Sequence, residues 1–182
     1  MIDFLEEHFD AILTSFITIV GFIATYQFTK RNLKNELQKS KQQLNMEAIK
    51  ELPYEICQIL NDINEDSKKT SAQQKNLLFR YSEIISKVLV YGSCEAVSIA
   101  VYMQQTTYQS NGDTDNESKW KLMAGWSLLI TQLKYDLTDV VISPETWFKL
   151  KIKDYEDNKA PIQNAINELI KTLGLNDDFW VQ

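Results

Sequence analysis

Residues 119–137, KWKLMAGWSLLITQLKYDL, are the stretch that decides the fold. Large apolar side chains recur there every three or four residues, so that one set shares a helix face: Leu122, Trp126, Leu129, Leu133 and Leu137. No alternating pattern of a strand interrupts the stretch. It predicts a long helix in the core of an all-α domain.

Helical periodicity continues on both sides and predicts a bundle of about five helices over residues 53–182. Local signals give the expected bounds: a helix opened by Pro53, one ended by Gly92, one capped by Ser93, one opened by Ser143-Pro144-Glu145, and one over 161–173 ended by Gly174. The stretch 110–118, SNGDTDNES, predicts a loop, and VVIS at 140–143 could be a short extended piece.

A basic helical neck is predicted at residues 30–52, which contain neither glycine nor proline. Leu33, Leu37, Ser40 and Leu44 follow one another at spacings of 4, 3 and 4, the pattern of a short coiled coil. Ser40 interrupts that seam, and a solvated helical stalk is the alternative.

The stretch 11–29, AILTSFITIVGFIATYQFT, contains no charged side chain. As a helix it would be about 28 Å long, close to the thickness of the hydrocarbon core of a bilayer. A short acidic tail at 1–10 precedes it, and the basic residues Lys30, Arg31 and Lys34 follow it. These flanks predict a single-pass transmembrane helix of the bacterial inner membrane, with the N-terminus outside, Lys30, Arg31 and Lys34 at the membrane surface and the helical domain in the cytoplasm.

Two other interpretations of this segment compete. A secretory signal peptide would begin with basic residues and end in a cleavage site, and the segment has neither. A buried core helix remains the alternative, because threonines and Gln27 make the segment only moderately apolar. Small residues at spacings of three and four form a possible association face within the membrane, although such a stripe also arises by chance: Ala11, Thr14, Thr18, Gly21 and Thr25.

Composition restricts the chemistry. The 182 residues are 44% apolar and 24% charged, which fits an ordered protein. His8 is the single histidine, and Cys57 and Cys94 are the two cysteines, so that we expect no metal site, no cofactor and no histidine-dependent catalysis. A hydrolase that uses converging carboxylates stays open, because such partners meet only in the fold.

Two aromatic features are left as candidate sites. Tyr91, Gly92 and Ser93 join two predicted helices at a turn that could hold an anionic ligand, although an ordinary helix–helix turn is the simpler interpretation. Phe179 and Trp180, near the C-terminus, could dock a partner. The net charge of −6 and the presence of only two arginines argue against nucleic acid as that partner.

The stretches LVYGSCEAV at 89–97 and LLITQLKYDLTDVVISPETWFKLKIKDYED at 128–157 are similar to segments of uncharacterised bacterial membrane proteins. Proteins of that set have one N-terminal span, a charged neck and a small α-helical cytosolic domain. Some are associated with phage-defence or mobile-element loci. The resemblance implies the same architecture and supplies no catalytic residue.

These features together predict a membrane-anchored, non-enzymatic helical protein. We expect it to act by self-association or by recruiting a membrane or cytosolic partner, with phage defence as one setting. The lipid bilayer is its first expected partner. The alternative is a ligand-gated membrane sensor whose helical domain binds a small molecule.

Overall fold

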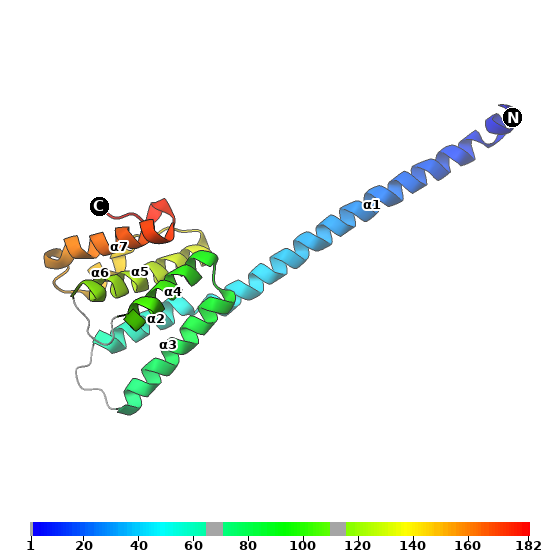
Figure 1. Ribbon diagram of the computed structural model, residues 1–182. Helices are drawn as coiled ribbons and strands as arrows, with labels where there is room; N and C mark the ends of the chain where they lie inside the picture. Colours follow the sequence, from blue (N-terminus) through cyan, green and yellow to red (C-terminus); the bar gives the residue numbers. More distant parts are fainter. Residues whose placement is uncertain (1, 65–70, 110–115) are drawn as a thin grey trace. The chain divides into compact units, whose positions relative to one another are not determined.

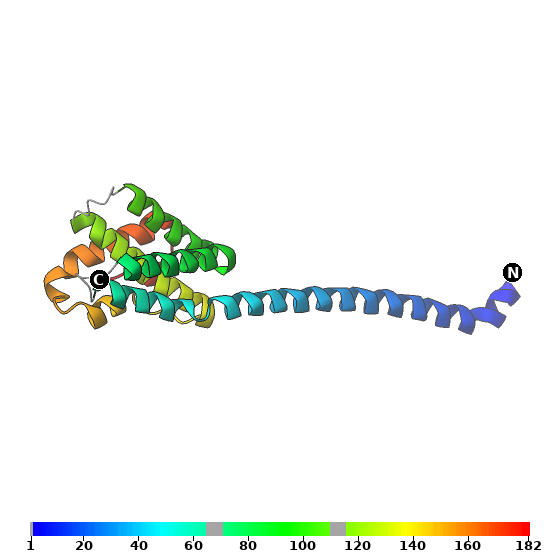
Figure 2. The ribbon, with the colours of Figure 1, turned by 90° about the horizontal axis from the view of Figure 1, so that it is seen from below.

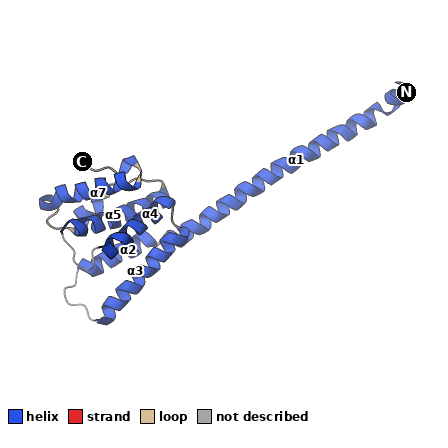
Figure 3. Cartoon of the chain, viewed as in Figure 1, coloured by secondary structure: helices blue, strands red, loops and turns tan. Residues whose placement is uncertain are grey.

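The computed structural model describes residues 2–64, 71–109 and 116–182. Inside helices, nothing is described for the side chains of residues 2–13, 15–17, 63–64, 71, 74 and 116–117. The described chain consists of α-helices, two short 3-10 helices and connections, without a strand (Figure 3). The all-α prediction is confirmed, VVIS at 140–143 forms no regular element, and most of the predicted loop at 110–118 lies outside the described residues.

Two compact units divide the chain, at residues 1–44 and 45–182. The first unit contains only the long helix α1, Ile2–Ile49, which also supplies the first residues of the second unit. The helical neck expected at 30–52 is thus continuous with the segment before it (Figure 1). Every described side chain of α1 up to Glu47 is exposed.

The predicted transmembrane helix at 11–29 is wrong, because no helix of the described residues is both apolar and long enough to cross a membrane. Polar side chains such as Thr18, Thr25 and Gln27 lower the hydropathy of the segment, and the side chains of 11–13 and 15–17 lie outside the description. The single-pass topology and the inner-membrane localisation were derived from that span and are wrong with it.

In the described part of the second unit, six α-helices form the bundle, where about five were expected (Figure 1). They are α2 at Leu52–Asn64, α3 at Ser71–Tyr91, α4 at Cys94–Gln109, α5 at Asn116–Thr138, α6 at Glu145–Lys151 and α7 at Lys159–Leu173. The 3-10 helix η1, Glu156–Asn158, precedes α7, and η2, Asp177–Phe179, follows it.

Helix α5 is the centre of this bundle and contacts α2, α4, α6 and α7 (Figures 1 and 2). All residues from 124 to 133 are buried, so that the interior covers every side of the helix and not only the predicted face. Close packing with α4 requires Gly125, because a Cβ atom there would lie 2.6 Å from Cγ of Met103. The Oγ of the buried Ser127 donates to the backbone oxygen of Ala124 at 2.9 Å, which satisfies its hydroxyl within the helix.

The predicted helix ends are largely confirmed. The Oγ of Ser93 accepts a hydrogen bond from the backbone N–H of Ala96 at 3.2 Å, as an N-cap does. Helix α7 ends at Gly174, whose φ of 62° is left-handed. Helix α6 begins at Glu145, one residue after Pro144, and the Oγ of Ser143 accepts from the N–H of Glu145 at 3.3 Å.

Candidate functional site

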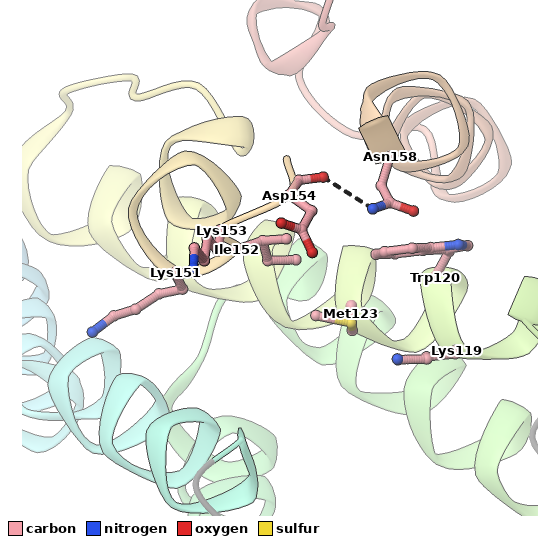
Figure 4. A pocket seen from close by; sticks show the side chains of 8 residues that line it. All are labelled: Lys119, Trp120, Met123, Lys151, Ile152, Lys153, Asp154 and Asn158. Carbon is pink, nitrogen blue, oxygen red and sulfur yellow. Dashed lines mark hydrogen bonds between the residues drawn. The ribbon is translucent and has the colours of Figure 1, made fainter. Parts of the chain in front are cut away.

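A solvent-open pocket of 510 Å³ lies between the start of α5 and the segment that joins α6 to α7 (Figure 4). Its lining consists of Lys119, Trp120 and Met123 from α5, and of Lys151, Ile152, Lys153, Asp154 and Asn158 from the joining segment and its ends. The side-chain N–H of Asn158 donates to the backbone oxygen of Asp154 at 2.9 Å, which fixes the pocket rim.

The pocket is cationic although the chain carries a net charge of −6. Three lysines and one aspartate line it, and Nζ of Lys119 lies 5.8 Å from the centre of the Trp120 ring. Lys151 extends away from Trp120 in Figure 4, so that Lys119 is the lysine that lies beside the indole ring. Ammonium groups beside an indole ring suit an anion that also carries an aromatic ring.

Catalysis is not suggested by this lining. It contains no serine, cysteine, histidine or glutamate, and its single carboxylate, Asp154, is exposed. A nucleophile needs an adjacent base within hydrogen-bond reach, and these side chains offer no such pair.

A second pocket, of 460 Å³, is almost wholly apolar and lies among α2, α3, α4 and α5. Its lining includes Ile59, Leu78, Tyr81 and Trp126. The hydroxyl of Tyr81 donates to Oε1 of Gln104 at 2.7 Å, and its ring meets Trp126 edge to face at 5.7 Å. Burial raises the pKa of Tyr81 above its ordinary value, so that the phenol stays neutral.

The predicted association face lies on α1, and its first residue, Ala11, is outside the described side chains. Thr14, Thr18, Gly21 and Thr25 are exposed. The hydroxyl of Thr18 donates to the backbone oxygen of Thr14 at 2.7 Å and is thus already bonded within the helix. The expected membrane-surface residues Lys30, Arg31 and Lys34 are also exposed on α1.

The turn at Tyr91, Gly92 and Ser93 lies at the junction of α3 and α4 and lines neither pocket. A Cβ atom at Gly92 would lie 2.6 Å from the backbone oxygen of Val88, so that glycine serves a tight helix end there. Of the two expected docking residues, Phe179 is buried against Tyr135 and Trp180 is 45% exposed. Only Trp180 is accessible to a partner.

The structure contains a polar cluster that binds the last residues of the chain and that the sequence analysis did not predict. The side-chain N–H of Gln163 donates to Oε1 of Glu145 at 2.5 Å and to the backbone oxygen of Gln182 at 2.6 Å. Asn167 pairs through its amide with the backbone of Val181, at 2.9 Å and 3.1 Å. The sequence shows only that Gln163 and Asn167, four residues apart on a predicted helix, share one face of it.

We expect Glu145→Gln to destabilise the protein by about 1–3 kcal/mol at pH 7, because a buried ionised acceptor is lost. Burial opposes ionisation of Glu145, but hydrogen bonds from Lys149 and Gln163 outweigh it and hold the pKa of this carboxyl below 4.5. The stabilisation is therefore present above pH 4.5 and is lost as pH falls through the lowered pKa.

Urea unfolding of the unchanged protein and of the Glu145→Gln variant, between pH 3 and pH 7, measures the difference in their free energies of unfolding. The gap between them should shrink as the medium becomes acidic, and the exposed control Glu156→Gln should show no such gap. A gap for Glu145→Gln that stays constant with pH would contradict the role of its charge.

No group of three or more histidine, cysteine, aspartate or glutamate side chains within the described ranges could hold a metal ion. No protein-family model matches the chain, and the searches of curated proteins and of solved structures found no match. The likeness of 89–97 and 128–157 to bacterial membrane proteins therefore stays a prediction.

Proposed function

We propose that this chain is a non-enzymatic protein that acts by self-association or by recruiting a helical partner. One observation carries the proposal: α1 exposes a series of large apolar side chains that nothing within its unit covers. Among them are Ile19, Phe22, Ile23 and Phe28, each more than half exposed. The unit contains no second element that could bury them.

The physical reason is the hydrophobic effect. Burial of one large apolar side chain stabilises an assembly by about 1.5–3 kcal/mol. Contiguous apolar surface on a monomer is rare unless it serves an interaction. Because a helix in a protein gains most of its stability from packing, a partner helix would stabilise α1.

Native mass spectrometry of the purified full-length protein tests this proposal, since it retains bound chains. We expect a homo-oligomer or a complex with another protein. The bare monomer of 21.2 kDa at every concentration would contradict the proposal.

A small-molecule sensor is the second candidate function, favoured by the cationic pocket beside Trp120. Under this candidate, an aromatic anion would bind there with its ring beside Trp120 and its negative group on Lys119. Adenosine 5′-monophosphate is a suitable probe, because it combines a phosphate with an aromatic base.

We expect the substitution Lys119→Gln to weaken binding of this probe about tenfold, because one charge-assisted contact beside Trp120 is lost. Isothermal titration calorimetry measures the change. Lys171→Gln, an exposed lysine on α7 outside the pocket, is the matched control and should leave affinity unchanged. Equal affinity of the Lys119→Gln variant and the unchanged protein would contradict the site.

A further inference from the structure

A seven-residue pattern runs along α1 from residue 19 to residue 44. With Ile23 at position a of a heptad, positions a fall at 23, 30, 37 and 44, and positions d at 19, 26, 33 and 40. Six of these eight positions carry large apolar side chains: Ile19, Ile23, Tyr26, Leu33, Leu37 and Leu44. A pattern sustained over more than three heptads is typical of a coiled coil.

The seam is uncovered in the isolated chain. Its six large apolar side chains are between 54% and 67% exposed. All of them lie on one continuous helix, α1, which is the whole of its compact unit (Figure 2). At 1.5 Å per residue the seam is about 39 Å long, and two such helices would bury each other's stripes over that length.

A lysine within the seam favours a pair of helices. Lys30 occupies position a, where a lysine fixes register and helix number at some cost in stability. Its aliphatic stem can lie along the seam while the ammonium group reaches water.

Flanking charges select the orientation. Glu36 is at position g, and Lys41, five residues later, is at the following position e. In a parallel pair, position g of one helix meets the next position e of the other, so that Glu36 and Lys41 attract each other twice. In an antiparallel pair, e positions meet e positions, and Lys34 and Lys41 would then face lysines.

We infer that α1 pairs with α1 of a second copy in a parallel two-stranded coiled coil along the seam from Ile19 to Leu44. This inference rests on the proposed self-association and names its partner, its orientation and its register. Thr14 and Gly21 then fall at position f, and Thr18 and Thr25 at position c. The small-residue face therefore lies on the outside of the pair.

Disulfide cross-linking of the full-length chain tests the register. Ser40→Cys places a thiol at position d, where the two copies of a parallel pair meet, and leaves every apolar seam residue in place. The matched control Gln42→Cys carries its thiol at the outward position f. Both are made with Cys57→Ala and Cys94→Ser, which removes the free thiols.

Mild oxidation should convert most of the Ser40→Cys protein, and less than a tenth of the control, to a covalent dimer. Equal cross-linking of the Ser40→Cys variant and the Gln42→Cys control would overturn the assignment of the interface to this seam. A native homo-oligomer without a Ser40→Cys cross-link would overturn the parallel register and leave self-association standing. A monomer in native mass spectrometry would overturn both.

Discussion

Replacement of Leu33 and Leu37 by alanine raises the dissociation constant of the expected homodimer by about 10⁴-fold. Four leucines leave the interface, two from each chain, and each contributes about 1.5 kcal/mol or more when it is buried. Alanine is the best helix former, so that α1 keeps its secondary structure. Sedimentation equilibrium of the full-length variant measures the effect.

Two controls separate the seam from other effects of substitution. Gln38→Ala/Gln42→Ala changes neighbouring exposed positions, b and f, and should leave the dissociation constant within about threefold of the original. Thr18→Leu/Gly21→Leu tests the small-residue face, which would be blocked by leucine if that face carried the contact. Loss of the dimer in this second control, with the leucine variant still dimeric, would transfer the interface to the small-residue face.

Phe148→Ala is expected to destabilise the bundle by about 3–5 kcal/mol. Phe148 has no exposed surface, and its ring meets Trp147 edge to face with centroids 5.2 Å apart. A cavity of that size in a unit of this length lowers the melting temperature by roughly 10–15 °C. Differential scanning calorimetry measures it.

Leu150→Ala, on the same helix α6, is the matched control, since Leu150 is 75% exposed. It should change the melting temperature by less than about 2 °C. Similar losses for both variants would show that burial on α6 does not determine stability.

Sequence periodicity predicts the bundle well because its signals are local. Ser93 caps α4 and Gly174 ends α7, as capping rules require, and both depend on residues within one helical turn. The burial of α5 on all sides was harder to predict. Burial depends on how many other helices surround α5. It therefore extends to polar residues of α5 itself, such as Ser127 and Thr131.

The prediction for α1 failed for a different reason. The charge-free apolar stretch predicts a membrane span, and the coiled-coil pattern predicted from the sequence begins only at Leu33. One heptad repeat in fact continues through Tyr26 and Ile23 to Ile19. Composition favoured a membrane environment, whereas the heptad repeat favours a partner helix, as inferred above.

The candidate site was beyond sequence reasoning. Trp120 and Lys153 are 33 positions apart, and no motif joins them. They line one pocket because the segment after α6 lies beside the start of α5. Phe179 was likewise expected at the surface, but the turn of η2 directs it onto Tyr135.

Amide hydrogen exchange along α1 tests most directly whether a second copy covers this helix. The measurement compares the full-length protein with its Leu33→Ala/Leu37→Ala variant at one concentration, by mass spectrometry of peptides from residues 19–44. Self-association through the seam predicts that peptides from α1 exchange much more slowly in the unchanged protein than in the variant. Peptides from the helical bundle should exchange equally in the two proteins. Equal, rapid exchange of α1 in the two proteins would contradict it.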